Sequence, residues 1–531
     1  MPSVFEEKKL SKAIFRVGLP AMLGQLTTLI YNMADTFFVS LTKTPAMIAA
    51  VTLCAPILLI IMSIACIFGM GGSSVIARLL GEGKPHKAGQ AMNFCLYAMV
   101  LAGVVVLAVG LALMTPLARL AGADAENMGY TCDYLLYIFL GAPFIMLANG
   151  FVHLFRSVGL IKQGTVGLVL GNAINIVLDF VFINLLQWGT AGAALATSLG
   201  FACATVYYLV CMVQEARRGS DLMPLSLRQF HPHAEMVRSV VSIGIPGSLI
   251  TILMSAANIV LNNYIAIYGS DAVAAYGIAY KIDSVPIMLL VGLSQGVTPL
   301  IGYYYGAEER PRMFATVRLS IFYGIVLGAV FTAIFLIFGV QLSAIFLHEA
   351  ALIQQTAFFL RILCLSAPLV SVINMVTSYF QALGKALRSL TITILRNVVL
   401  FVPAVILLNH YWQLLGVIAA QPLAEALLTV VCLVLYLQDK QLEQHPEKAQ
   451  CKQQQKSPGK RCAFPDFLGI SSVFEPRLFL FRVQPDDIQQ DLGAAVHALG
   501  GDALAHAVEV EAAGAQVGAG QAHPAQGRAV G

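Results

Sequence analysis

The length and composition of the chain indicate an integral membrane protein. Of its 531 residues, 58% are hydrophobic and only 11% are charged, whereas an ordinary soluble protein has about 25% charged residues. The net charge of +4 mostly reflects basic residues between apolar segments, so it gives no indication of nucleic-acid binding, and the alternating segments of about 10 residues that mark a bacterial β-barrel do not occur.

Apolar stretches long enough to cross the membrane recur up to about residue 440. A helix needs about 20 apolar residues to span about 30 Å of hydrocarbon. We therefore predict an all-α polytopic membrane protein with twelve transmembrane helices. In chain order the predicted spans are 13–39, 47–76, 91–114, 130–155, 163–186, 191–214, 239–268, 273–303, 314–338, 352–381, 389–409 and 414–438.

Basic residues gather in alternate predicted loops. They precede the first span and follow the second, fourth, sixth, eighth and tenth, as at Lys84, Arg156, Arg217, Arg310 and Lys385. Loops rich in Lys and Arg stay on the cytoplasmic side. We therefore expect a multi-pass protein of the inner or plasma membrane with both termini in the cytoplasm.

The sequence contains none of the motifs that would indicate a resident cofactor or an enzyme. The ten cysteines show neither metal-ligand spacing nor a paired framework. A phosphate-binding GxxxxGK[ST] loop, an HExxH motif and a nucleophile elbow are all missing from the sequence. We expect no catalytic activity and no cofactor, and any transport would draw on an ion gradient.

The chain repeats itself at an offset of about 225 residues. Gly18-Leu19-Pro20 opens the first span and Gly244-Ile245-Pro246 opens the seventh, while Phe155 with Gly159 corresponds to Phe380 with Gly384. Six spans per half is an even number, so the two halves insert in the same direction, and substrate pathways commonly lie between such halves. We predict an N-terminal lobe over 1–220, a cytoplasmic linker over 221–238, and a C-terminal lobe over 239–440.

Polar groups within the first-half spans are the main candidates for function. Asp179 lies near the middle of the fifth span, with Asn175 one helical turn earlier, and Asp35 lies nearer the outer end of the first span. An acid inside a span costs about 2.5 to 3.5 kcal/mol on insertion scales, so such acids generally face water or a partner. In the second half the corresponding positions are apolar, which weakens a purely structural role. Two acids in one cavity could couple transport to a cation or to protons.

Other polar and aromatic residues in the spans are weaker candidates. We expect structural or loosely cavity-lining roles for Lys281 and Asp283, and packing roles for Glu425 and Arg361. Aromatic and methionine side chains can accept flat organic cations. The candidates for a cavity wall of this kind are Tyr31, Met33, Met62, Tyr276, Tyr280 and Met288. Pro20 removes a backbone hydrogen bond and permits a bend, so it is a candidate hinge.

These residues together resemble the multidrug and toxic compound extrusion (MATE) family, closest to its MepA-type branch. The resemblance covers residues 10 to about 440 and depends on "GLPAMLGQL", "YNMADTFFVSL", "ARLLGEGK", "NIVLD", "GAALATSLG" and "VTPLIGYYYGAEE". It implies a V-shaped pair of six-helix halves around a central cavity. It also implies an ion-coupling site for H+ or Na+ at Asp35, Asn175, Asp179 and Thr197.

The resemblance implies a secondary antiporter that exports organic, mostly cationic compounds. We expect it to bind such drugs and membrane lipids, to work as a monomer, and to bind no nucleic acid. A flippase for lipids or lipid-linked oligosaccharides, from the same wider superfamily, remains an alternative and would need a more cationic cavity. Residues 441–531 depart from the family pattern; their Ala, Gly and Gln content indicates a disordered or artefactual tail.

Overall fold

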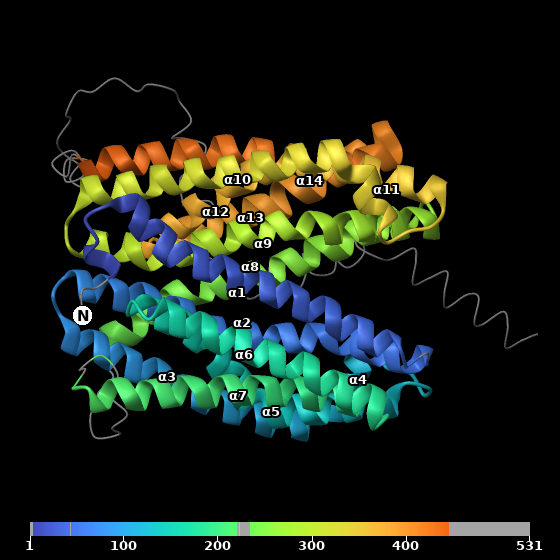
Figure 1. Cartoon of the computed structure of the whole chain (residues 1–531), viewed down its shortest axis with the longest axis horizontal. Helices are drawn as coiled ribbons and strands as arrows, with labels where there is room; N and C mark the ends of the chain where they lie inside the picture. Colours follow the sequence, from blue (N-terminus) through green and yellow to red (C-terminus); the bar gives the residue numbers. More distant parts are fainter. Residues whose placement is uncertain (1–3, 43, 220–221, 223–233, 445–531) are drawn as a thin grey trace, which may run out of the picture. The chain divides into compact units, whose positions relative to one another are not determined.

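The fold is described by a computed structural model of the chain (Figure 1), which covers residues 4–42, 44–219, 222 and 234–444. Every predicted span lies on one helix or on a run of successive helical segments. Most of the predicted linker, 221–238, and nearly all of the predicted tail, 441–531, lie outside the described residues. Two short segments are helical where a linker and a tail were expected, because α8 begins at Ala234 and α14 continues to Gln444.

The helices of the two halves follow one another along the chain. In the first half they are α1 (Leu10–Ser40), α2 (Pro45–Gly81), α3 (Pro85–Ala112), α4 (Met114–Leu120), α5 (Met128–Ser157), α6 (Ile161–Asp179) and α7 (Gly189–Arg217). In the second half they are α8 (Ala234–Ala266), α9 (Ser270–Gly306), α10 (Arg310–Ala344), α11 (Ala350–Leu363), α12 (Ala367–Ala382), α13 (Ala386–Ile394) and α14 (Phe401–Gln444). Short turns also occur at Val4–Glu6 and Cys364–Ser366, with π-helical segments at Phe180–Leu185 and Leu395–Leu400.

Within the described residues, eleven continuous helical stretches are long and apolar enough to cross a membrane. The longest, Ala386–Gln444, contains one residue with non-helical backbone angles, Gln413 (φ 51°, ψ −135°). The chain folds back at this residue. The evidence is that Gly416 lies against the carbonyl oxygen of Leu408, eight residues earlier, so closely that a Cβ atom on Gly416 would overlap it. This stretch therefore crosses twice, and the bundle has the twelve predicted crossings.

The internal repeat is visible in the helix boundaries and in the helix ends. α2 and α9 are both 37 residues long and begin and end at positions 225 residues apart. α5 and α12 end in the same way: Gly159 (φ +83°) and Gly384 (φ +73°) adopt the left-handed conformation that glycine tolerates best. The residue after each glycine donates its backbone N–H to the carbonyl five residues earlier, as in a Schellman cap. Leu160 donates to Phe155 at 2.9 Å and Lys385 donates to Phe380 at 2.8 Å.

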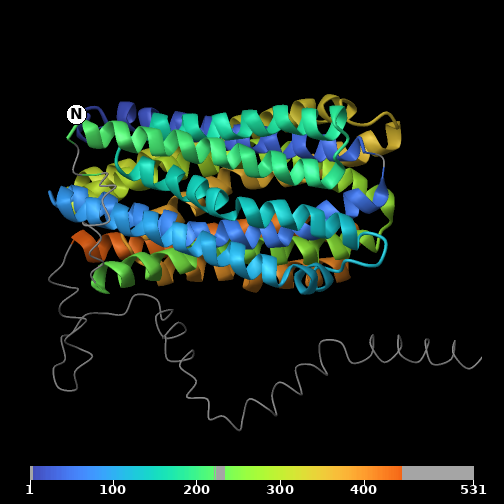
Figure 2. The ribbon, with the colours of Figure 1, turned by 90° about the horizontal axis from the view of Figure 1, so that it is seen from below.

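The two halves form two lobes, and helices α1 and α2 of the first half pack against helices α8 and α9 of the second. Figure 1 shows the first-half helices gathered below and the second-half helices above, and in Figure 2 the helices run side by side along one axis. Between the lobes, α1 packs against α9 and α2 against α8 and α9. Ile14 and Val17 of α1 belong to a hydrophobic core with Leu293 and Val297 of α9. The first turns of α1 are thus part of the second lobe's core.

We call the end of the bundle formed by the turns at 82–84, 158–160, 307–309 and 383–385 the basic end. The lobes make close backbone contact in the half of the bundle nearer to it. A Cβ atom at Gly71 would overlap the carbonyl of Val240, and one at Gly244 would overlap the carbonyl of Ile67. Glycine is required at such positions because any side chain would separate α2 from α8.

Towards the opposite end the ribbons of α1 and α2 diverge from those of α8 and α9 (Figure 1). Polar side chains are exposed on this part of the inner helices, namely Asn32 and Thr36 on α1 and Asn262 and Asn263 on α8. Polar groups within membrane spans generally face water rather than lipid. This end is therefore the candidate position of the predicted central cavity, and the V shape stays a prediction.

Candidate functional site

The first-lobe site is built around Asp179, the last residue of α6. One helical turn earlier, Asn175 lies on the same face, and its side-chain amide donates a hydrogen bond to the Thr197 hydroxyl on α7 at 3.3 Å. After Asp179 the backbone widens into the π-helical segment Phe180–Leu185. Such segments occur frequently at functional sites. Nothing in the sequence pattern indicated this one.

The Asp179 side chain is completely buried, and neither carboxylate oxygen has a hydrogen-bond partner among the described residues. The same is true of Oδ1 of Asn175, which is 2% exposed, and of Oδ1 of Asp35 on α1. Asp35 interacts electrostatically with Asp179. Side chains from α1 and α6 therefore bring four unpaired oxygens into one region. Buried polar groups normally have partners, so these oxygens indicate a site for a ligand.

The position of α1 against α6 and α7 is set by polar and aromatic contacts. Asn172 donates a hydrogen bond to the Thr28 hydroxyl at 3.3 Å, and Phe38 packs against Phe180 with ring centroids 6.2 Å apart. The Tyr31 side chain is buried and reaches the Thr197 hydroxyl. Tyr31 was predicted to line a cavity, and it lies next to the predicted ion-coupling residues.

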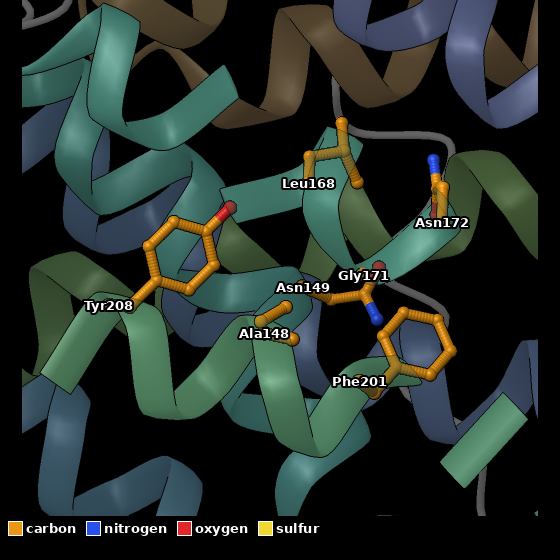
Figure 3. A pocket seen from close by; sticks show the side chains of 8 residues that line it. Ala148, Asn149, Leu168, Gly171, Asn172, Phe201 and Tyr208 are labelled. Carbon is orange, nitrogen blue, oxygen red and sulfur yellow. The ribbon is translucent and has the colours of Figure 1, made fainter. Parts of the chain in front are cut away.

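Two small adjoining pockets lie beside these residues. The first is lined by Tyr31, Asn172, Asn175, Thr197 and neighbouring backbone, and it has room for about one water-sized group. The second, between α5, α6 and α7, is shown in Figure 3 and has mostly apolar walls. The first pocket suits a single small cation or water molecule, because its lining supplies amide and hydroxyl oxygens.

The second-lobe positions that correspond to Asp35, Asn175 and Asp179 are apolar. Leu261, which corresponds to Asp35, is 2% exposed in a hydrophobic core, and Ala404, which corresponds to Asp179, packs against the same core. Leu400, which corresponds to Asn175, packs against another core. The same helices therefore form without these polar groups, so the fold does not require Asp35, Asn175 and Asp179.

Comparison with known proteins identifies the family. A family model described as MatE matches residues 20–181 and 246–406, one match in each lobe, and the two matches cover more than half of the chain. The chain belongs to the MATE family. The predicted resemblance is thereby confirmed, and the two matches agree with the internal repeat.

Relatives within the MATE family match over nearly their whole length. The multidrug export protein MepA of Staphylococcus saprophyticus is 30% identical over 434 residues, which is 82% of this chain and 95% of MepA. A solved structure described as MATE in complex with MaL6 is 26% identical, with a TM-score of 0.79 over 84% of this chain and 99% of the other. An outward-facing multidrug resistance MATE family transporter is also 26% identical, with a TM-score of 0.79, and covers 83% and 98%.

This MATE protein carries two buried acids in its second lobe, Asp283 and Glu425, for which the sequence predicted only structural, loosely cavity-lining or packing roles. Asp283 on α9 is completely buried, both of its oxygens lack a hydrogen-bond partner among the described residues, and it interacts electrostatically with Glu425. Glu425 on α14 pairs with Arg396 at 2.7 Å. Lys281 is exposed, so it faces away from Asp283, as their spacing predicts. The burial of Glu425 agrees with a packing role, whereas Arg361 is exposed.

The remaining predicted cavity residues are distributed over both lobes. Tyr276 and Tyr280 stack with ring centroids 5.9 Å apart, and Tyr276 belongs to a hydrophobic core of the second lobe. Met62 packs against a first-lobe core, and Met33 and Met288 are half-buried. Of the six predicted cavity residues, Tyr31 is the one that lines the pocket at Asn175 and Thr197. The role of the other five in substrate binding stays a prediction.

Pro20 lies inside the continuous helix α1, at the point where the helix passes from one lobe to the other. Before it, Ile14 and Val17 pack in a core with α9. After it, Thr28 accepts a hydrogen bond from Asn172 of α6, and Asp35 lies within electrostatic range of Asp179. Proline removes one helical hydrogen bond, so a bend at Pro20 would move the Asp35 part of α1 relative to the second lobe. The role of Pro20 as a hinge stays a prediction.

Arg156 corrects one sequence expectation. It was counted among the basic loop residues, but it is the second-last residue of α5 and is 1% exposed. Its partner within the described residues is Gln295 of the other lobe, whose Oε1 accepts a hydrogen bond from Nη1 at 3.0 Å. The sequence placed Arg156 in a loop because it lies just before the turn at Gly159. The packing of α9 across this turn buries it.

Proposed function

We propose that this MATE protein is a secondary antiporter that exports organic, mostly cationic compounds in exchange for H+ or Na+. The observation that carries this proposal is the buried Asp179 carboxyl group, which has no partner among the described residues and lies beside Asn175 and Asp35. A buried ionisable group in a membrane span is costly and is retained for a function. Asp179 would be the principal ion-coupling acid, with Asp35 as its partner.

The chemistry of the site suits a small hard cation or a proton. The unpaired atoms are carboxylate and amide oxygens, which are the ligands that such cations prefer. Thr197 would complete the site from α7. A proton or Na+ would neutralise one carboxylate and relieve its repulsion with the other, because two like charges repel strongly in a medium of low dielectric constant.

Exchange would follow from competition between the ion and the substrate. With the ion bound, α1 can approach α6 and the net negative charge of the region falls. Without it, the two carboxylates would favour an organic cation in the central cavity that the family resemblance implies. Since linkage is reciprocal, each ligand must lower the affinity for the other if exchange is to be tight. Pro20 would let α1 transmit the change between the lobes.

The similarity to the multidrug export protein MepA, at 30% identity over 95% of its length, supports export of organic compounds. The first-lobe site is acidic, which favours cationic substrates. The flippase alternative calls for a more cationic central cavity, and no specific feature of the Asp179 site supports it.

We also propose that the protein works as a monomer in the inner or plasma membrane with the basic end and both termini in the cytoplasm. Exposed basic side chains at that end, such as Lys162, Arg217 and Arg218, support this orientation. Large apolar side chains such as Leu101 and Phe322 are exposed on the outer helices and would face lipid. The end of the bundle at which α1 and α2 diverge from α8 and α9 would then face the outside.

The decisive experiment is efflux of ethidium from proteoliposomes under an imposed pH gradient and, separately, under a Na+ gradient. We expect the wild type to respond to one of them and thereby identify the coupling ion. Asp179→Asn should abolish the gradient-driven component, whereas Asp271→Asn, the same change at an exposed residue, should not. A wild type that is inert under both gradients, or equal transport by Asp179→Asn, would refute the proposal.

A further inference from the structure

A separate small pocket lies between the two lobes and shares no lining residue with the pocket at Asn175 and Thr197. Its walls come from α2 and α5 of the first lobe and from α9 and α12 of the second. The polar residues that matter here are Ser73, His153 and Arg156 on one side and Gln295, Thr298 and Gln381 on the other. The first-lobe site therefore does not account for this pocket.

The pocket lies on the axis that relates the two halves. Three pairs of its lining residues are 225 positions apart, the offset of the internal repeat: Ser73 with Thr298, Met70 with Gln295, and Arg156 with Gln381. Equivalent positions from both halves can line one pocket only if the pocket lies where the halves meet about their common axis. A ligand bound there would contact both lobes at once.

The Arg156 side chain is buried in this pocket without a neutralising partner. Nη1 donates to Gln295 Oε1 at 3.0 Å, but Nε and Nη2 have no hydrogen-bond partner among the described residues. The same Gln295 oxygen also accepts from Gln25 at 2.8 Å, and an amide oxygen carries no charge to offset a guanidinium. The ion pairs formed within the described part of the chain do not include Arg156. A buried charge that stays unpaired is strongly unfavourable.

The repeat shows that the fold does not require this charge. Gln381 occupies the position equivalent to Arg156, three residues before the glycine of the same helix cap. Its side chain is neutral and donates to the Ser389 hydroxyl at 3.2 Å. A neutral residue can therefore end the equivalent helix. The positive charge at Arg156 consequently points to a ligand of opposite charge.

The size and lining of the pocket limit that ligand. The pocket has room for about two water-sized groups, which is too little for a drug-sized molecule. No acidic residue lines it. Thr298 and Ser74 already donate their hydroxyl groups to backbone carbonyls at 2.7 Å. The groups in this pocket that could donate hydrogen bonds to an anion are thus the guanidinium of Arg156, the Ser73 hydroxyl and the His153 imidazole.

We propose that this pocket binds a small monovalent inorganic anion, such as chloride, on the Nε and Nη2 groups of Arg156. The anion neutralises the buried guanidinium, and it stabilises the arrangement in which the lobes are closed at the basic end because both lobes form its site. This inference does not depend on the antiport function or on the coupling ion at Asp179.

The test is the thermal stability of the purified full chain in detergent, in sodium chloride and in sodium gluconate at equal ionic strength. Equal sodium removes any effect of the cation, and gluconate is too large for the pocket. We expect the melting temperature of the wild type to rise with chloride and to saturate. Arg156→Gln, which copies the residue at the equivalent position, should abolish the response. Arg218→Gln, at an exposed arginine, should retain it.

Equilibrium dialysis with radioactive chloride gives a second measurement. We expect about one saturable chloride per wild-type chain and a several-fold weaker affinity in Ser73→Ala, which retains Arg156 and keeps the test valid if Arg156→Gln fails to fold. Absence of saturable binding in the wild type, or an equal chloride response in Arg156→Gln, would overturn the proposal. Stabilisation by acetate without any by chloride would also overturn it, because the ligand would then be an organic carboxylate.

Discussion

The side-chain amide of Asn175 donates a hydrogen bond to the Thr197 hydroxyl at 3.3 Å, which joins α6 to α7 one helical turn before Asp179. This bond directs the other amide atom, Oδ1 of Asn175, into a buried region where it has no hydrogen-bond partner among the described residues. Thr197 is 2% exposed, and its side chain also forms a hydrogen bond with the Tyr31 side chain. Thr197 therefore positions the amide and the tyrosine that adjoin the Asp179 carboxyl group.

Thr197→Val should weaken binding of the coupling ion without abolishing transport. Valine keeps the shape of threonine but removes the hydroxyl, and one hydrogen bond contributes about 0.5 to 1.5 kcal/mol. We expect the half-saturating ion concentration for ethidium efflux to rise up to about tenfold. The control is Thr205→Val on the same helix, where the hydroxyl donates to the Phe144 carbonyl at 3.0 Å. An equal shift in both variants would contradict the role of Thr197.

Gly71→Ala should destabilise the closed contact between the lobes. A Cβ atom there would overlap the Val240 carbonyl, so α2 and α8 would have to separate. Overpacking of this kind costs about 1 to 3 kcal/mol. The measurement is the melting temperature in a single detergent. Gly277→Ala is the matched control, because a Cβ atom on Gly277 would meet no heavy atom within 4 Å, and we expect its melting temperature to be unchanged or slightly higher.

Much of the fold could be predicted from the sequence because the bilayer imposes a simple rule. Every span needs about 20 apolar residues, so hydropathy alone located the helices. The repeat then related Gly159 to Gly384, and both glycines end their helices with the same cap. The acidic site was also accessible, since Asp35 and Asp179 are rare charges in apolar segments whose counterparts in the other half are apolar.

The rest depends on which way side chains face, and a sequence without strong periodicity does not specify that. Lys281 and Asp283 are two residues apart, yet one is exposed and the other fully buried. The sequence places the charged residue Arg156 in a loop, whereas in the structure α9 packs over the end of α5 and buries it. The π-helical segment after Asp179 has no sequence signal, because it is a local widening of a helix with ordinary composition.

Asp439→Asn should destabilise the basic end of the second lobe. The Asp439 side chain is 1% exposed and forms ion pairs with Lys385 Nζ, at 2.7 Å, and with Arg388. It also accepts a hydrogen bond from the Tyr379 hydroxyl at 2.8 Å. Removing one partner of a buried ion pair costs about 3 to 5 kcal/mol, because the remaining charge is left uncompensated. The Lys385 and Arg388 side chains are 26% and 40% exposed, so water reduces this cost. We expect a loss near the lower value in denaturant unfolding of the purified protein.

Glu443→Gln is the control for that prediction. Glu443 also pairs with Lys385, at 2.8 Å, but its side chain is 16% exposed, against 1% for Asp439. Water can replace part of the lost interaction, and partly exposed pairs contribute about 0 to 1 kcal/mol. A larger loss for Glu443→Gln than for Asp439→Asn would show that burial does not determine the strength of this network.

Arg396→Gln should be more destabilising than loss of the whole Arg396 and Glu425 pair. The two side chains form a 2.7 Å ion pair in which Glu425 is 4% exposed, and Asp283 lies within electrostatic reach. The single change leaves the buried Glu425 without its cation, at a cost of about 3 to 5 kcal/mol. The double variant Arg396→Met with Glu425→Leu removes the pair and fills the space with apolar groups, so much of the stability should return.

Unfolding of both variants and of the wild type in one detergent measures this difference directly. The exposed pair of Lys84 with Glu82, at 2.7 Å and with side chains 51% and 39% exposed, supplies the comparison, because removing either partner there should change stability by less than about 1 kcal/mol. If the double variant were as unstable as Arg396→Gln, the ion pair itself would stabilise the lobe. In that case the unpaired charge of Glu425 would not be the source of the loss.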